Sequence, residues 1–248
     1  MEAIELIRKR VQWCESEGVE ILCCPEAILG GLADYSPQPA DFAIDVERGQ
    51  LAAVLAPLTS STVTIIIGFT EIAGRDRLYN AAAVFQNGNV VGLYRKLYPA
   101  INKSVYEPGD RIPVFTIDGL TFGIILCNDS NFVEPARIMA AKGATALFVP
   151  TNNGLPANRS RPDLVSHARN VDIARAIDNS VSVIRADVSG STDGLVSHGS
   201  SAIIDSDGMA LQSAALLSET VLVADIETVP RRRRRLIAQE FVEDENLG

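Results

Sequence analysis

Three reactive side chains each follow directly after a largely apolar run of residues. Glu26 follows Val-Glu-Ile-Leu-Cys-Cys-Pro, Lys96 follows Val-Val-Gly-Leu-Tyr-Arg, and Cys127 follows Phe-Gly-Ile-Ile-Leu. Short apolar runs of this kind predict strands, and the ends of strands are common places for active sites. The sequence therefore predicts a carboxylate, an ammonium and a thiol at the ends of three strands.

These three groups have the chemistry of an acyl-transfer site. A free thiol has a pKa near ~8.5, so it needs a base or a cation to become a useful thiolate. A carboxylate such as Glu26 can take the thiol proton and return it to a leaving amine. The ammonium of Lys96 can stabilise both the Cys127 thiolate and a tetrahedral oxyanion, and the backbone N–H of Asn128 is the expected second oxyanion donor.

Each residue also has a purely structural interpretation. Cys127 alone can be a small buried hydrophobe, Glu26 can cap the segment that follows it, and Lys96 can be a solvated strand end. A Cys–His dyad that uses His167 or His198 is a further alternative, although no motif supports it.

The hydrophobic pattern predicts the elements that position these residues. Apolar residues at steps of three and four predict a helix over 3–17 that Gly18 ends, and the run Val19–Cys24 predicts a strand buried on both faces. Asn87-Gly88, Asp118-Gly119 and Asp207-Gly208 predict three hairpins. The other expected helices are 48–59, 134–142 and 163–178, and the other expected strands are 63–70, 81–85, 90–94, 113–117, 121–126, 146–149, 182–186, 201–205, 209–213 and 220–226.

This order of elements predicts one α/β domain over residues 1–248. Hairpins alternate with single helices, which gives many strands and about four helices. Two sheets packed face to face, with helices covering the outer faces, accommodate such a set. The sequence contains no linker, repeat or low-complexity segment that would divide it.

Composition excludes several classes of function. The net charge of −9 argues against a nucleic-acid partner, and apolar runs far shorter than ~20 residues argue against a membrane span. Four cysteines without a CxxC pair and only two histidines argue against a zinc site. No signal peptide is evident, so we expect reduced thiols and a cytoplasmic location. The five arginines 231–235 are interpreted as a solvated helix start that pairs with acidic residues 240–245.

The ordered set of motifs resembles the nitrilase, or carbon–nitrogen hydrolase, superfamily. Cys24-Pro25-Glu26, Tyr94-Arg95-Lys96 and Leu126-Cys127-Asn128-Asp129 occur in family order, with the three reactive residues 70 and 31 positions apart. The resemblance covers nearly the whole chain. Supporting stretches are Tyr106-Glu107-Pro108-Gly109-Asp110, Glu134-Pro135-Ala136-Arg137, Arg175-Ala176-Ile177-Asp178-Asn179 and Gly199-Ser200-Ser201.

The resemblance implies a fold and a mechanism. It implies an α-β-β-α sandwich, with Glu26 as general base and acid, Lys96 as oxyanion stabiliser and Cys127 as nucleophile. The reaction would pass through a thioester that water hydrolyses, without a metal or an organic cofactor. Relatives usually pair helix to helix, so the resemblance implies a homodimer or a larger homo-oligomer.

Three departures from the family pattern qualify this resemblance. The chain begins inside the first helix, so the first strand of the family is expected to be missing. Asn102 stands where many members have a further glutamate, and the C-terminal tail is short. The alternative to an active enzyme is therefore a truncated, catalytically impaired homologue that acts as a binding partner.

The residues after Cys127 bear on the substrate. Nitrilases of the family usually have Cys-Trp-Glu, whereas this chain has Cys-Asn-Asp. N-carbamoyl amino acid hydrolases share Cys-Asn-Asp but continue with Arg-Arg-Trp-Pro, where this chain has Ser-Asn-Phe-Val; Arg159 and Arg161 could replace those arginines, or could be loop arginines in water. We expect a hydrolase of small amides that releases ammonia. An N-carbamoyl amidohydrolase and a nitrilase remain alternatives.

The substrate pocket is predicted from position in the motifs. Tyr98, Tyr106 and Phe132 are expected to wall a small pocket that admits short substrates. The residues expected to bind the oxyanion or the substrate are Asn128, Asn102, Tyr98, Phe132 and Asn152.

Overall fold

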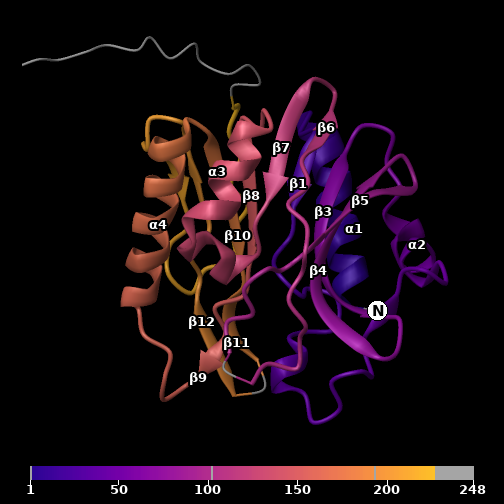
Figure 1. Cartoon of the computed structure of the whole chain (residues 1–248). Coiled ribbons are helices and arrows are strands. Elements are labelled where there is room, and N and C mark those ends of the chain that lie inside the picture. Colours follow the sequence, from indigo (N-terminus) through magenta and orange to yellow (C-terminus); the bar gives the residue numbers. More distant parts are fainter. Residues whose placement is uncertain (1, 102, 193, 227–248) are drawn as a thin grey trace, which may run out of the picture.

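The computed structural model of the chain describes residues 2–101, 103–192 and 194–226. Two sheets pack face to face, with α1 and α2 on the outer side of one sheet and α3 and α4 on the outer side of the other (Figure 1). This α-β-β-α arrangement confirms the predicted α/β class. The arginines at 231–235 and the acidic residues at 240–245 lie outside the described residues.

The first sheet holds the segments that lead to Glu26 and Lys96. Its strand order is β1-β3-β4-β5, and a short strand β2 also pairs with β3. The Asn87-Gly88 turn joins β4 to β5 with both residues at positive φ, as a hairpin turn of this type requires. The elements on this side are α1 (Glu2–Glu17), β1 (Ile21–Cys23), β2 (Ile44–Asp45), α2 (Gln50–Leu55), β3 (Thr64–Ala73), β4 (Arg77–Gln86) and β5 (Asn89–Arg95).

The second sheet holds the segment that leads to Cys127. Its strand order is β14-β13-β10-β8-β7-β6, with β7, β8 and β10 parallel to one another. The elements on this side are β6 (Phe115–Ile117), β7 (Leu120–Ile124), α3 (Val133–Ala141), β8 (Ala146–Thr151), α4 (Asp163–Asn179), β10 (Ser182–Asp187), β13 (Ala202–Ile204) and β14 (Ala210–Ser213).

Alternation along β3 builds the layers. Ile66 belongs to the apolar cluster between the two sheets, whereas Ile65 and Ile67 belong to the cluster beneath α1. Successive side chains of a strand point to opposite faces, so the apolar run Ile65–Ile67 contributes to both layers. On the other side of the second cluster, α1 contributes Ile7 and Val11, in agreement with the predicted helix.

Two predictions about strands need correction. Residues 220–226 form no strand in the structure, because their backbone joins no ladder among the described residues. Strand β1 was predicted to be fully buried. It packs against apolar clusters on both faces, but its residues are only half-buried, because β1 lies at the edge of its sheet and pairs only with β3 among the described strands. The expected loss of a preceding strand remains a prediction.

A small third sheet was not predicted from the sequence. It pairs β11 (Ser189–Thr192), β12 (Leu195–His198) and β9 (Leu155–Pro156), in the order β11-β12-β9. These strands are too short and too polar to show a clear alternation of apolar residues. Within the described part of the chain, no helix is both long enough and apolar enough to cross a membrane.

Candidate active site

The Glu26 carboxylate is buried at the seam between the two sheets. After β1, the chain stays beside β3, because Cys24 N donates a hydrogen bond to Ile66 O at 2.8 Å. Glu26 N then donates to Thr151 O of the second sheet at 3.3 Å, and the Glu26 residue is 1% exposed. The segment thus passes from one sheet to the other and carries its carboxylate inward.

A glycine in β3 makes room for this segment. A Cβ atom on Gly68 would lie 2.5 Å from Ala27 N, 2.7 Å from Pro25 O and 2.8 Å from Glu26 Cα. These contacts are with backbone atoms, which cannot rotate away as a flexible side chain can. Ala27 itself has a left-handed backbone with a φ of 48°. Gly68 is therefore required for the position of Glu26.

Lys96 meets Glu26 from the end of β5. Lys96 N donates to Asn80 O at 2.8 Å, which holds the residue beside β4, and Lys96 Nζ lies 2.5 Å from Glu26 Oε1. Burial opposes the positive charge, but the charges of Glu26, Cys127 and Asp129 outweigh it and raise the pKa of Lys96 above its ordinary value. Lys96 is therefore an ammonium in this site.

Two further donors fix the Glu26 carboxylate. Asn80 Nδ2 donates to Oε1 at 2.8 Å, and the backbone N–H of Asn152 donates to Oε2 at 2.9 Å. With Lys96, these donors come from β4, β5 and the loop after β8. Sequence reasoning missed Asn80; its only signal is a polar residue directly before the apolar run 81–85 of a buried strand.

Cys127 opens a tight turn that follows β7 after Ile125 and Leu126. Its φ of 44° lies in the left-handed region, which is unusual for a residue other than glycine, asparagine or aspartate. The buried Asp129 carboxylate fastens this turn: it accepts hydrogen bonds from Leu126 N at 3.1 Å, from Tyr94 Oη at 2.7 Å and from Tyr98 N at 2.8 Å. Burial raises the pKa of Asp129 to about 6. Strained backbone at a reactive residue persists only when its surroundings hold it there.

The electrostatic surroundings of Cys127 include both other reactive residues. Burial raises the pKa of the Cys127 thiol to about 12, the negative charge of Glu26 adds to this, and the positive charges of Lys96 and Arg185 oppose it. The structure therefore brings Glu26, Lys96 and Cys127 together, and their catalytic roles stay a prediction. The thiol also lies 3.5 Å from Asn153 Oδ1, in the geometry of an S–H donor to an amide oxygen.

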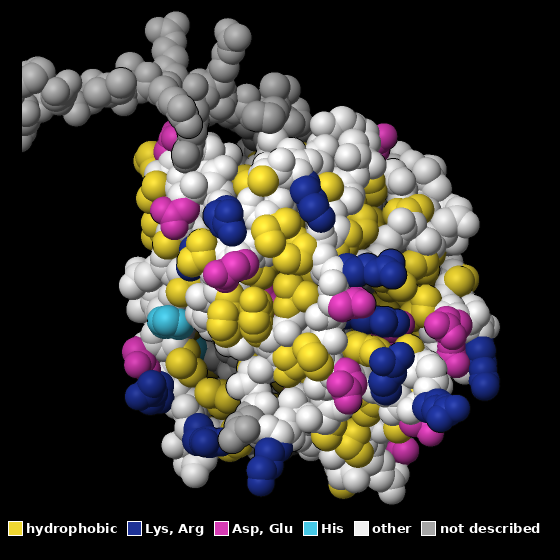
Figure 2. All heavy atoms as spheres, viewed as in Figure 1, with side chains coloured by type: hydrophobic (Ala, Val, Ile, Leu, Met, Phe, Trp, Pro, Cys, Tyr) yellow, Lys and Arg dark blue, Asp and Glu magenta, His cyan; other side chains and the backbone are white. Residues whose placement is uncertain are grey.

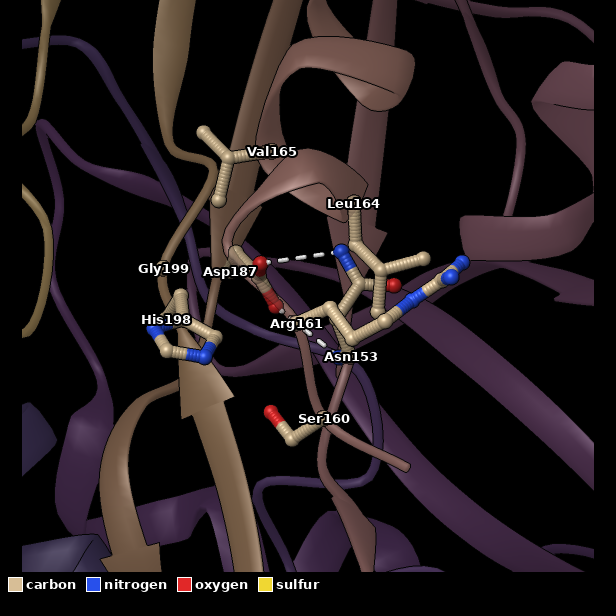
Figure 3. Close-up of a pocket in the computed structure, with 8 residues that line it drawn as sticks. All are labelled: Asn153, Ser160, Arg161, Leu164, Val165, Asp187, His198 and Gly199. Atoms are coloured by element: carbon tan, nitrogen blue, oxygen red, sulfur yellow. Dashed lines mark hydrogen bonds between the residues drawn. The ribbon is translucent and has the colours of Figure 1, made fainter. Parts of the chain in front are cut away.

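Asn153 connects the thiol to a small pocket. Its N–H and Nδ2 both donate to the Asp187 carboxylate at 3.1 Å, and burial raises the pKa of Asp187. Figure 3 shows this pair between Leu164 and Val165 on one side and Ser160 and His198 on the other. The pocket has a volume of only about 10 Å³ and is lined by Asn153, Ser160, Arg161, Leu164, Val165, Asp187, His198 and Gly199. Sequence reasoning missed Asn153 and Asp187 as site residues; Asn153 lies two residues beyond β8, and Asp187 is the last residue of β10.

The remaining predicted site residues fall into different places. Asn128 Nδ2 donates to Tyr98 O at 3.0 Å, and the rings of Tyr98 and Phe132 stack at 3.7 Å. Asn152 contacts Glu26 through its backbone, while its side chain accepts a hydrogen bond from Gly154 N at 3.0 Å. Asn102 lies outside the described residues.

The predicted wall of three aromatic residues needs correction. Tyr106 packs in a separate cluster with Ala33 and Leu78 rather than on the Tyr98–Phe132 pair. Its hydroxyl accepts a hydrogen bond from Ala33 N at 2.7 Å and lies 2.8 Å from Thr70 Oγ1. Tyr106 therefore joins elements of the fold, and its polar end is already occupied.

Among the described residues, no contact joins His167 or His198 to the Cys127 thiol, so the alternative of a Cys–His dyad has no support. His167 Nε2 lies 3.0 Å from Asn131 Oδ1 on the surface of α4, and His198 lines the pocket beside Asp187. The described part of the chain also contains no group of three His, Cys, Asp or Glu residues that could hold a metal ion.

The sequence matches the carbon-nitrogen hydrolase family over residues 1–234. The chain belongs to the carbon-nitrogen hydrolase family. It is 28% identical over 232 residues to a nitrilase of Pyrococcus abyssi, a match that covers 92% of this chain and 84% of the nitrilase. It is 26% identical over 257 residues to a glutamine-dependent NAD(+) synthetase of Thermotoga maritima, of which it spans only 42% of the length.

A solved amidase shares the fold of this carbon-nitrogen hydrolase. The amidase of Nesterenkonia sp. superimposes with a TM-score of 0.73 at 23% identity, covering 87% of this chain and 80% of the amidase. The family resemblance expected from the motifs is thus confirmed, and so is the enzyme class, a hydrolase of carbon–nitrogen bonds other than peptide bonds.

Proposed function

We propose that this carbon-nitrogen hydrolase cleaves small primary amides through a thioester on Cys127 and releases ammonia. The observation that supports this most strongly is the buried Glu26 carboxylate, which accepts hydrogen bonds from Lys96 and Asn80 and whose charge acts on the Cys127 thiol. A base, a cation and a thiol are the three groups that amide cleavage by a cysteine needs.

The first half-reaction forms the thioester. Glu26 takes the proton of the Cys127 thiol, and the sulfur attacks the amide carbon. Lys96 Nζ and the N–H of Asn128 stabilise the oxyanion that develops on the former carbonyl oxygen. When the carbon–nitrogen bond breaks, the nitrogen takes the proton back from Glu26 and leaves as ammonia.

The second half-reaction regenerates the thiol. Glu26 takes a proton from a water molecule, whose oxygen attacks the thioester carbon. The carbon–sulfur bond then breaks, and the Cys127 thiolate takes the proton from Glu26 as the carboxylic acid leaves. Glu26 thus acts as base and acid in both halves, which suits a carboxylate held by fixed donors and not by solvent.

The residue after Cys127 supports an amide substrate. It is asparagine, not the tryptophan usual in nitrilases, which favours amides over nitriles. The pocket that Asn153 lines has a volume of only about 10 Å³, which leaves room for about one water molecule.

An N-carbamoyl amino acid is the second candidate substrate, and one observation favours it. Arg161 lines the pocket that adjoins Asn153, so its guanidinium could bind a substrate carboxylate. The Arg161 side chain is 68% exposed, however, and its Nε lies 3.4 Å from Asp163 Oδ1. An exposed arginine that already has an acidic neighbour binds a second carboxylate weakly, so we rank this substrate below a simple amide.

A homo-oligomer through the outer helices is part of the proposal. Val133 of α3 is 44% exposed and Ile177 of α4 is 47% exposed. Figure 2 shows apolar side chains gathered on the face that α3 and α4 cover. Sedimentation or light scattering of the purified protein would measure the oligomeric state.

Ammonia release from a panel of short amides, N-carbamoyl amino acids and nitriles tests the proposal. We expect release from short amides by the native protein and none from a Cys127→Ala variant. Ammonia release from only N-carbamoyl amino acids or only nitriles would show that this class, and not short amides, is the substrate. A folded protein that releases ammonia from no compound would overturn the proposal and favour the catalytically impaired alternative.

A further inference from the structure

A guanidinium is buried directly behind the candidate active site. Arg185 lies on β10 and is 3% exposed. Its Nε and Nη2 donate to the two carboxylate oxygens of Asp172 on α4, at 2.6 and 2.5 Å. Such a two-point contact fixes the plane of the guanidinium, and so it also fixes the direction of the remaining N–H donors.

One of these donors reaches the turn that carries the thiol. Arg185 Nη2 donates to Ser130 Oγ at 3.0 Å, and Ser130 Oγ donates to Cys127 O at 2.8 Å. The same turn is held from α4, because Arg175 Nε donates to Ser130 O at 2.9 Å. The backbone of Cys127 is therefore connected to the guanidinium through a single hydroxyl.

Another donor reaches the segment that carries the carboxylate. Arg185 Nη1 donates to Thr151 Oγ1 at 2.7 Å, and Thr151 O accepts the N–H of Glu26 at 3.3 Å. Thr151 ends β8, and the next residue, Asn152, donates its N–H to the Glu26 carboxylate at 2.9 Å. The same guanidinium thus connects to both sides of the reaction, the nucleophile and the base.

Stability alone is a weak reason for this buried ion pair. Apolar residues of similar volume often replace a buried ion pair without loss of stability, because burying two charges costs as much as their attraction returns. The reactive residue beside it, in contrast, has a left-handed backbone that its surroundings must hold. The hydrogen bonds from Arg185 to Ser130 and Thr151 are therefore better explained by the positions of the thiol and the base than by stability.

We propose that Arg185 is a positioning residue that sets the Cys127 nucleophile and the Glu26 base relative to each other, through Ser130 and Thr151. This inference rests on the proposed function in that it assigns these two roles to Glu26 and Cys127. Arg185 touches neither reacting group, so its effect on the rate is indirect. Its positive charge also faces the thiol, together with that of Lys96 and against those of Glu26 and Asp187.

Substitutions at both ends of the network test the proposal. Arg185→Lys keeps the charge but loses the two-point contact, Ser130→Ala cuts the connection to Cys127, and Thr151→Val cuts the connection to Glu26. We expect Arg185→Lys to lower kcat about 10- to 100-fold with little change in KM, because small misplacements of reacting groups have large effects on rate. Ser130→Ala and Thr151→Val should each lower kcat by less.

A matched control is available on α4. Arg169 Nη1 donates to Ser213 Oγ, and no described contact connects Arg169 to Cys127 or Glu26. Its charge interacts with those of Arg185 and Asp172, and lysine keeps that charge. Arg169→Lys should therefore leave kcat unchanged. If Arg185→Lys does not fold, Ser130→Ala and Thr151→Val, which each remove only one side-chain hydrogen-bonding group, decide the question. Values of kcat within about twofold of the native enzyme for all folded variants would overturn the proposal.

Alkylation of the thiol by iodoacetamide separates charge from geometry and needs no known substrate. Arg185→Met removes a positive charge that faces the thiol, so Cys127 should react more slowly than in the native protein at each pH. Arg185→Lys should keep the native pH dependence. If Arg185 had a purely structural role, both substitutions would lower Tm, and the alkylation rate of Cys127 would show the same pH dependence in both variants. Equal pH profiles for the two variants would therefore contradict the proposal.

The same measurement distinguishes failure of this inference from failure of the proposed function. If the native protein hydrolyses no amide, the alkylation profiles still report whether Arg185 acts on Cys127. If amides are hydrolysed but the Arg185 variants match the native enzyme in both assays, the proposed function stands and the positioning role is wrong.

Discussion

Lys96 Nζ lies 2.5 Å from Glu26 Oε1, and the two side chains are only 5% and 1% exposed. The pair joins a residue at the end of β5 to one beyond β1, and Asn80 of the intervening β4 donates to the same oxygen. Neither charge can reach solvent, so each depends on the other. This dependence makes the pair sensitive to removal of either partner.

Removing one partner should reduce both stability and activity. Lys96→Met leaves the Glu26 carboxylate buried without its cation, and we expect the free energy of unfolding to fall by about 3–5 kcal/mol. Glu26→Gln should lower kcat by about 10²- to 10⁴-fold, because an amide cannot transfer the proton. Urea unfolding and ammonia release measure the two effects.

The double variant serves as the control for the buried pair. Glu26→Gln with Lys96→Met leaves no unpaired charge, so its loss of stability should be smaller than the sum of the two single losses. Additive losses would show that the two side chains do not depend on each other.

The left-handed backbone of Cys127 predicts that stability and function oppose each other at this position. Glycine adopts positive φ without steric cost, so Cys127→Gly should be more stable than Cys127→Ala by about 1 kcal/mol, after the greater freedom of glycine in the unfolded chain is included. Both variants should be inactive. Thermal unfolding compares them directly, and a less stable glycine variant would show that the turn is not strained.

Gly68→Ala should impair activity because the added methyl group displaces the Glu26 segment. The new Cβ would lie 2.5–2.8 Å from backbone atoms of residues 25–27. We expect kcat to fall about 10²-fold, together with a loss of stability of about 1–3 kcal/mol.

Gly92→Ala is the matched control for this substitution. Its Cβ would clash with the ring of Phe115, so it also overpacks the interior, but against a side chain and not against the Glu26 segment. It should lower Tm and keep kcat. Equal losses of kcat in both variants would contradict a specific role for Gly68.

The raised pKa of Cys127 predicts a slow reaction with alkylating reagents at neutral pH. With the pKa of the thiol at about 12, the rate of alkylation by iodoacetamide should rise with pH and show no plateau below pH ~9. Lys96→Met removes a positive charge that lowers this pKa, so the rate should fall at each pH. Mass spectrometry of the labelled peptide measures the rate, and a plateau near neutral pH would contradict the expected pKa.

Arg161 decides between the two candidate substrates. For a simple amide, Arg161→Gln should leave KM within about twofold of the native value, because the substrate has no carboxylate to bind. For an N-carbamoyl amino acid, loss of the guanidinium should raise KM about tenfold or more. Parallel kinetics with one substrate of each class distinguish the two outcomes, and an increase in KM for the amide would show that Arg161 acts on something other than a carboxylate.

Local patterns in the sequence were sufficient to predict most of the helices and strands and to single out the three reactive residues. Steps of three and four predicted α1, Asn-Gly and Asp-Gly predicted the hairpins, and the polar ends of apolar runs predicted Glu26, Lys96 and Cys127. These features depend on neighbours in the chain, which is why they can be read without a structure. The run 220–226 has an equally apolar pattern, yet it forms no strand among the described residues, because a strand also needs a partner.

Only the tertiary structure showed what surrounds these residues. Asn80, Asn153 and Asp187 are ordinary polar residues in the sequence, and they contact the site because the fold brings strands distant in the chain together. The ion pair of Arg185 with Asp172 joins β10 to α4. Further hydrogen bonds connect Arg185 through Ser130 to the turn of Cys127, and through Thr151 of β8 to Glu26. The sequence by itself determined which groups we propose for the chemistry, because chemistry depends on residue type. The packing of two sheets decided how those groups are held, because hydrogen-bond geometry depends on distances between segments far apart in the chain.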